Sequence, residues 1–201
     1  VKDIISEVRV NGDQALIKFC SKFDNFTVTN PKELEIPKKQ LSEALNKISV
    51  EELEALKFAK KRIEEFSAHQ KAKSWNYTSE GIMLGEKLSP IEKAGIYVPG
   101  GSAVYPSSVL MNSIPAKVAG VGEIVMVVPS PQGSINDLVL AAAFLGGVDR
   151  LFRIGGAHAI AALALGTNTI PKVNIIVGPG NQYVAEAKKE LYGEVGIDNF
   201  A

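Results

Sequence analysis

Short apolar segments alternate with helical segments along residues 91–201, and this alternation limits the fold more than any other feature of the sequence. The predicted strands are 94–98, 123–128, 150–154 and 173–177, and the predicted helices are 107–121, 135–145, 157–165 and 182–191. Short strands that are apolar throughout and are separated by helices are typical of a parallel sheet covered on both faces. We therefore predict a doubly wound α/β fold with right-handed crossovers.

Residues 1–90 differ from the rest of the chain in charge and in predicted structure. They carry 29 charged side chains, whereas residues 91–201 carry 15, which predicts a domain boundary near Pro90. We expect a helix-rich α/β segment before this boundary. Its predicted elements are amphipathic helices at 13–23 and 51–71 and a hairpin of strands 75–78 and 82–88. Helical spacing predicts buried faces made of Leu16, Phe19, Cys20 and Phe23 in the first helix and of Leu53, Leu56, Ala59, Ile63 and Phe66 in the second.

The balance of charges argues against two classes of partner. The chain has 22 basic and 22 acidic residues and a pI near 6.9, so we expect neither nucleic acid nor a membrane surface as partner. The longest mostly apolar run, 138–148, is too short to cross a bilayer. The single cysteine, Cys20, fits a reducing compartment, and we expect a cytoplasmic location.

Three glycine-containing turns follow predicted strands, at 97–103, 155–158 and 178–181. In an open parallel sheet, ligands bind beyond the carboxyl ends of the strands, and glycine lets the backbone approach a ligand closely. Any one of these turns could equally be a tight connection that binds nothing. Three on one sheet edge favour a small-ligand cleft, although none matches the dinucleotide fingerprint Gly-x-Gly-x-x-Gly.

Tyr97, His158 and Asn181 are the candidate binding residues of these turns. Tyr97 could present its ring and hydroxyl to a ligand, or it could pack internally with its hydroxyl bonded to a partner. Asn181 is expected to cap the following helix, a role compatible with ligand contact. His158 lies in the first turn of a helix, where the positive end of the dipole favours a neutral imidazole. If it faces a ligand, we expect acidification to pH 5.5 to weaken binding.

Five segments together resemble histidinol dehydrogenases. Residues 95–103 read Gly-Ile-Tyr-Val-Pro-Gly-Gly-Ser-Ala, 155–164 read Gly-Gly-Ala-His-Ala-Ile-Ala-Ala-Leu-Ala, and 172–181 end in Gly-Pro-Gly-Asn. Near the amino terminus, 11–16 read Asn-Gly-Asp-Gln-Ala-Leu and 22–24 read Lys-Phe-Asp. Their order and spacing match the family as well, so the resemblance extends over essentially the whole chain.

The resemblance implies an incomplete Rossmann-like NAD-binding domain over 91–201, with 1–90 as part of a discontinuous first domain. It also implies that Tyr97, His158 and Asn181 contact NAD. The family usually has glutamine at the position of His158, and an imidazole cannot reproduce both groups of an amide at once. This departure affects the strength or pose of cofactor binding more than its location.

The resemblance further implies a reaction, in which L-histidinol is oxidised through L-histidinal to L-histidine with two NAD and a zinc ion in a homodimer. Because the family's zinc ligands and its Glu–His acid–base pair follow later in the sequence, we expect no catalytic residue and no zinc ligand before residue 201. The alternative is a stand-alone α/β module that binds a nucleotide or another small ligand without catalysis.

Overall fold

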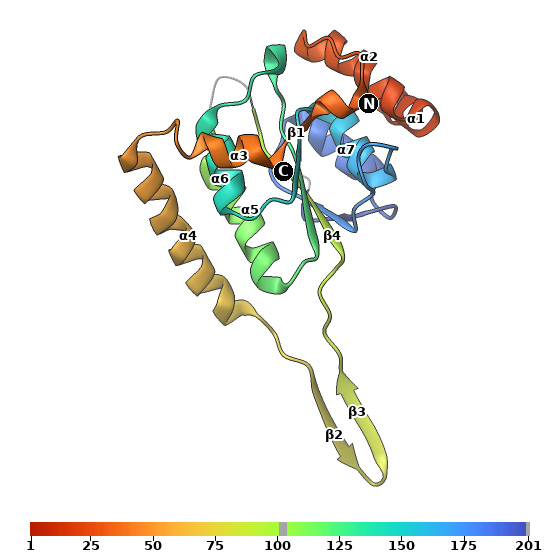
Figure 1. Ribbon diagram of the computed structural model, residues 1–201. Helices are drawn as coiled ribbons and strands as arrows, with labels where there is room; N and C mark the ends of the chain where they lie inside the picture. The colour runs from red at the N-terminus through yellow and green to blue at the C-terminus, as the bar shows by residue number, and fades with distance from the viewer. Residues whose placement is uncertain (101–103, 200–201) are drawn as a thin grey trace.

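The computed structural model describes residues 1–100 and 104–199 and is built around a six-stranded sheet (Figure 1). The strands of this sheet are β1 (Glu35–Ile36), β4 (Lys93–Tyr97), β5 (Glu123–Val127), β6 (Arg150–Phe152), β7 (Ile175–Val177) and β8 (Gly196–Ile197). They lie in the order β1-β6-β5-β4-β7-β8, and the pairs from β6 to β8 are all parallel. Counted from β4, this is the order 3-2-1-4-5 of an incomplete doubly wound sheet, so the predicted fold class is confirmed.

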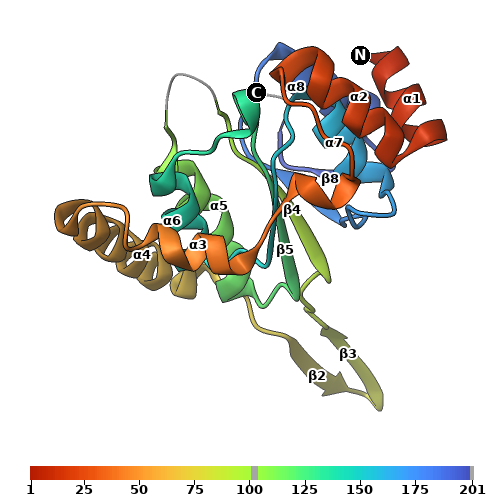
Figure 2. The same ribbon diagram turned by 45° about the horizontal axis from the view of Figure 1, so that its top comes forward.

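Helices cover both faces of the sheet, as Figure 2 shows. One face carries α3 (Lys38–Ala44), α4 (Val50–Gln70), α5 (Pro106–Ala119) and α6 (Asp137–Leu145). The other face carries α1 (Lys2–Asn11), α2 (Asp13–Asp24), α7 (Gly156–Leu165) and α8 (Gln182–Glu190). Two 3₁₀ turns, Pro31–Leu34 and Pro131–Gly133, lie in the connections. The elements predicted over 91–201 are all present, with ends shifted by at most two residues.

After their first residues, which are charged in β4, β5 and β6, the central strands are apolar because each of them contributes to two cores. In β5, Val125 and Val127 pack in the core below α7, whereas Ile124 and Met126 pack in the core below α5 and α6. Successive side chains of a strand point to opposite faces, so a strand covered on both sides needs apolar residues at every position. This burial holds the carboxyl ends of the strands, and the turns that follow them, in a rigid frame.

The amino-terminal segment contributes an edge strand that the sequence analysis did not predict. In β1, Glu35 and Ile36 pair antiparallel with Phe152 and Leu151 of β6. The Glu35 carboxylate accepts two hydrogen bonds of 2.7 Å from the Arg150 guanidinium, a two-pronged contact that fixes register. Residues before Pro90 therefore pack on the same sheet as those after it, and the division into two domains stays a prediction.

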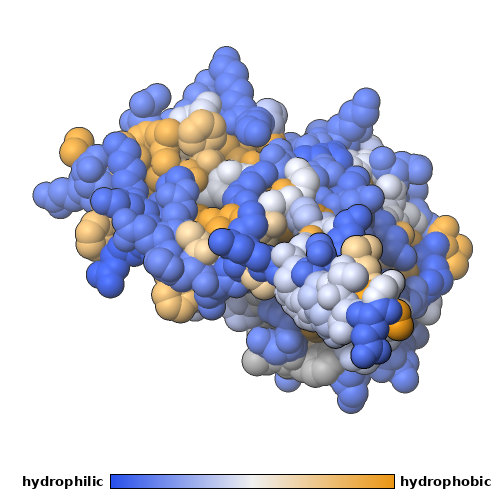
Figure 3. Space-filling model, turned by 90° about the horizontal axis from the view of Figure 1, so that it is seen from below, coloured by the Kyte–Doolittle hydropathy of each residue, from blue (hydrophilic) through white to orange (hydrophobic). Residues whose placement is uncertain are grey.

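The hairpin of β2 (Trp75–Ser79) and β3 (Ile82–Glu86) projects away from the sheet (Figure 1). All ten of its residues are exposed, Trp75 and Met83 among them. Figure 3, which views the molecule from this end, shows hydrophobic residues among the hydrophilic ones. Within the described ranges, no helix is both long enough and apolar enough to cross a membrane.

Two residues predicted to be buried are exposed. Phe23 of α2 is 51% exposed and Phe66 of α4 is 67% exposed, whereas Leu16, Phe19 and Cys20 are buried as predicted. Helical spacing identified the correct side of α2, but Phe23 lies at its rim, where it stacks on Phe19 with ring centroids 5.6 Å apart. In α4 the inward position of the last turns belongs to Ser67, so Phe66 points away from the core.

Candidate functional site

The turns after β4, β6 and β7 meet around one cavity of about 490 Å³ at the carboxyl edge of the sheet. Tyr97, His158 and Asn181, which are far apart in the sequence, all line it. Its remaining lining residues come from the same edge and from α1 and α2: Ile4, Phe23, Asp24, Pro99, Gly100, Pro129, Gly155, Gly156, Ala157 and Tyr183. The predicted cleft is thus present at the place where doubly wound sheets bind ligands.

Tyr97 is packed in the core and is only 2% exposed. Its hydroxyl accepts a hydrogen bond of 3.1 Å from the backbone N–H of Gly156, the first residue of α7. Burial raises the pKa of Tyr97 to about 12, with a smaller rise from Asp24 and an opposing effect of the Gly156 hydrogen bond. The hydroxyl therefore stays protonated and holds the start of α7 in place, while the residue still forms part of the cavity wall.

Asn181 caps α8, as predicted. Its side-chain oxygen accepts hydrogen bonds from the backbone N–H groups of Tyr183 and Val184, at 3.0 and 3.1 Å. This leaves the side-chain nitrogen as the group that can donate to a ligand in the cavity. Cap and ligand contact thus use different atoms of the same amide.

His158 is almost completely buried, with 2% of its surface exposed. Its ring lies against Phe19 and Phe23, with centroids 5.6 and 5.9 Å away. Burial lowers the pKa of His158 to about 4, so the predicted neutral imidazole is confirmed, although burial rather than the helix dipole is the cause. At pH 5.5 the ring remains neutral, so the predicted loss of ligand binding at that pH is not expected from this residue.

Gly178 shows why the turn after β7 needs glycine. Its φ is +109°, and a Cβ there would lie 2.1 Å from the carbonyl oxygen of Tyr97. A side chain would therefore push β7 away from β4, at the point where the strand order reverses. This close approach positions Asn181 beside the cavity.

A buried ion pair behind this turn was missed by the sequence analysis. Lys188 of α8 is fully buried and donates hydrogen bonds of 2.6 Å to the Gly178 carbonyl and 2.7 Å to Asp198. The second carboxylate oxygen of Asp198 accepts from the Gly178 N–H at 2.8 Å. Both backbone groups of Gly178 are thereby held by side chains from beyond the strand.

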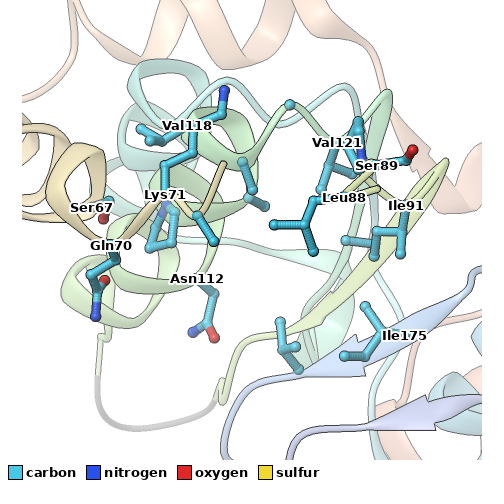
Figure 4. Close-up of a pocket in the computed structure, with 18 of the residues that line it drawn as sticks. Ser67, Gln70, Lys71, Leu88, Ser89, Ile91, Asn112, Val118, Val121 and Ile175 are labelled. Carbon is cyan, nitrogen blue, oxygen red and sulfur yellow. The ribbon is translucent and has the colours of Figure 1, made fainter. Parts of the chain in front are cut away.

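A second, larger cavity of about 730 Å³ lies beside α5 (Figure 4). Leu88, Ile91, Val121 and Ile175 form its apolar wall, and the end of α4 contributes polar groups such as Lys71. It lacks glycine turns at strand ends and any acid–base pair among the described residues. The smaller cavity at the carboxyl edge is therefore the candidate site. Residues 101–103, which belong to the predicted first turn, lie outside the described residues.

The strand order and the cavity at its switch point define a Rossmann-like α/β protein. The family model described as histidinol dehydrogenase matches residues 1–201. The chain belongs to the histidinol dehydrogenase family.

Individual relatives agree with this assignment. The chain is 55% identical to histidinol dehydrogenase of Pseudomonas savastanoi pv. phaseolicola, and the alignment covers all of this chain and 45% of that protein. It is 51% identical to the enzyme of Hydrogenovibrio crunogenus, of which it covers 47%. The crystal structure of histidinol dehydrogenase from Elizabethkingia anophelis superposes with a TM-score of 0.91 at 37% identity, over 98% of this chain and 46% of that one. The chain thus spans about half the length of these relatives.

Proposed function

We propose that the full-length protein is an NAD-dependent oxidoreductase that converts L-histidinol through L-histidinal to L-histidine, and that this chain provides part of its NAD site. One observation carries the proposal beyond family membership: Tyr97, His158 and Asn181, from three separate turns, line a single cavity. We further propose a homodimer, as the resemblance implies, and a cytoplasmic location, which fits the single cysteine.

The residues of the cavity suit a dinucleotide in distinct ways. Asn181 offers its side-chain nitrogen as a donor, Tyr97 keeps α7 at the cavity edge, and His158 forms a neutral wall beside the ligand. The amino terminus of α7 adds the positive end of its helix dipole, which favours an anionic group such as a pyrophosphate. When bound, NAD supplies the hydride acceptor of the reaction.

The turn after β5 departs from typical dinucleotide-binding domains. Those domains place an acidic residue near that strand end to bind a ribose hydroxyl. Here residues 128–130 are Val-Pro-Ser, with no carboxylate. We therefore expect the cofactor to lie differently along the sheet edge, closer to the turns after β6 and β7.

The zinc ion of the proposed reaction is expected to have its ligands outside this chain. The resemblance places its ligands, and the acid–base pair, beyond residue 201. We therefore expect none of the residues that line the cavity to transfer protons in the oxidation of histidinol.

Asn181 provides a test that separates cofactor contact from helix capping. Serine is also a good cap, so Asn181→Ser should preserve the thermal stability while removing the amide nitrogen. We expect its NAD dissociation constant, measured by calorimetry on the full-length protein, to rise about 2- to 10-fold, as for one lost hydrogen bond. Asn181→Ala, the matched variant, should lose both NAD affinity and about 1 kcal/mol of stability.

Unchanged NAD affinity in Asn181→Ser would contradict the proposed site. A second readout is the formation of NADH on addition of histidinol to the wild-type protein. NAD binding without this turnover would instead favour a binding module without catalysis.

A further inference from the structure

Three side chains that can ligate a metal meet between α2 and α7. Cys20 and Asp24 come from α2, and His158 comes from the first turn of α7. One ligand atom from each lies within 4.8 Å of the other two. The spacing of Cys20 and Asp24 by four residues puts both on one side of the helix, facing α7. We call these three residues the α2–α7 cluster.

Polar atoms of the α2–α7 cluster are buried without partners. Among the described residues, five buried side-chain atoms lack a hydrogen-bond partner, and three of them are Asp24 Oδ2, His158 Nδ1 and His158 Nε2. A buried polar atom without a partner is destabilising, so such groups in proteins usually contact a water molecule or an ion. An imidazole that is 2% exposed and has neither nitrogen bonded points to a ligand between the two helices.

We propose that the α2–α7 cluster binds a divalent cation of the zinc type through Cys20 Sγ, an Asp24 oxygen and a His158 nitrogen. In tetrahedral zinc sites, bonds of about 2.0–2.3 Å place the ligand atoms roughly 3.3–3.8 Å apart. Pairs of atoms that already lie within 4.8 Å of one another need to approach by at most about 1.5 Å to reach this geometry. The site is distinct from the zinc site of the proposed reaction, whose ligands the resemblance places beyond residue 201. It departs from the expectation that no zinc ligand lies before residue 201, which concerned the ligands of the reaction.

The chemistry of the three ligands selects the cation. Thiolate and imidazole favour zinc and similar transition metals, whereas Mg²⁺ and Ca²⁺ prefer sites made only of oxygen. On binding, the Cys20 thiol releases its proton to solvent and the sulfur–metal bond forms, without any change of oxidation state. Without the cation, burial and, less strongly, Asp24 raise the pKa of Cys20 to about 12, so a role as a nucleophile is disfavoured.

The fourth coordination position would face the candidate site. Asp24 and His158 line the cavity at the carboxyl edge of the sheet, whereas Cys20 is fully buried and does not line it. A cation in the cluster would therefore be reached through this cavity. Coordination by one ring nitrogen of His158 leaves the proton on the other, so the ring becomes a fixed donor. The cation would also hold α2 against α7.

Cobalt titration of the full-length protein tests the proposal, because Co²⁺ bound to a thiolate absorbs in the near ultraviolet and Co²⁺ bound only by nitrogen and oxygen lacks this band. After treatment with a chelator, the wild-type protein should develop the band within two equivalents of Co²⁺, one for this site and one for the zinc site of the proposed reaction, and Zn²⁺ should remove it. Cys20→Ala should abolish the band, and His158→Gln should weaken Co²⁺ binding at this site by about tenfold or more. His69→Gln is the control, because His69 lies at the exposed end of α4, and it should behave as wild type.

The absence of the band in the wild-type protein would overturn the proposal, whatever the folding of the variants. A band that persists in Cys20→Ala would overturn it as well, since the thiolate would then lie elsewhere. Loss of NAD binding or of histidinol oxidation does not enter this test, so the failure of the proposed function is distinguishable from the failure of the metal site.

Discussion

Replacing Lys188 by methionine removes the charge behind the Gly178 turn while nearly preserving the side-chain volume. Lys188 is fully buried and bridges the Gly178 carbonyl and Asp198. The variant therefore deletes two hydrogen bonds from a charged donor and leaves the Asp198 carboxylate without its counter-ion. Lys189→Met is the matched control. The Lys189 side chain is 69% exposed, and its ion pair with Glu186 is long, at 4.0 Å.

The geometry sets the size of the expected effect. Breaking a buried ion pair costs about 3–5 kcal/mol. The side chain of Asp198 is 25% exposed, so water can partly solvate the remaining carboxylate, and we expect about 3 kcal/mol. In a chain of this size each kcal/mol lowers the melting temperature by about 2–4 °C, which predicts a decrease of about 6–12 °C for Lys188→Met. Lys189→Met should change stability by at most about 0.5 kcal/mol.

Differential scanning calorimetry of both variants, together with NAD titrations, measures the effect. Because the turn carries Asn181, Lys188→Met should also weaken NAD binding. The double variant Lys188→Met/Asp198→Asn should regain at least about 1 kcal/mol, since it no longer contains an unpaired buried charge. Equal melting temperatures of Lys188→Met and Lys189→Met would refute the reasoning.

Two further substitutions address the same sheet edge. Gly178→Ala should lower the free energy of unfolding by at least about 3 kcal/mol, because its Cβ would overlap the Tyr97 carbonyl. Gly81→Ala, at the open hairpin tip, should lower it by only about 1 kcal/mol, because of its positive φ. Urea unfolding of both variants measures the difference. The pKa of Tyr97 is raised from 10.0 to about 12 by burial, so its contribution to stability is complete below pH 10 and is lost as the pH rises to 12. At pH 11 the loss is about 1.4 kcal/mol, and thermal unfolding at pH 9 and 11 should show it in wild type but not in Tyr97→Phe.

Most of the fold after Pro90 could be predicted because the strands are buried on both faces and their apolar runs stand out between helices. The two-residue strand β1 could not. Glu35 and Ile36 have no periodicity of their own, and their place depends on Arg150, more than a hundred positions away. Short edge strands of this kind are defined by their partners rather than by local sequence.

The candidate site was predictable in position but not in its details. Glycine turns at strand ends identified Tyr97, His158 and Asn181, since parallel strands bring their carboxyl ends together. Asp24 was missed, because its approach to His158 depends on how α2 packs against α7. Periodicity also assigned Phe23 to the core, although the residue is exposed. The spacing identifies which side of a helix faces the core, but it does not show how far the neighbouring layer extends along that helix.

Lys188 did carry a signal that the sequence analysis overlooked. Val184, Ala187 and Leu191 are buried and follow helical spacing, so position 188 falls on the same inward stripe of α8. A lysine on such a stripe must find a carboxylate or carbonyl partner, because a buried charge without one is too costly to be retained. The stripe therefore predicts that Lys188 is buried and that Lys189 is not. The partner of Lys188, Asp198, follows β8, the next strand of the parallel sheet. A charged residue in an apolar helical pattern thus indicates a buried hydrogen bond or ion pair between that helix and a neighbouring turn.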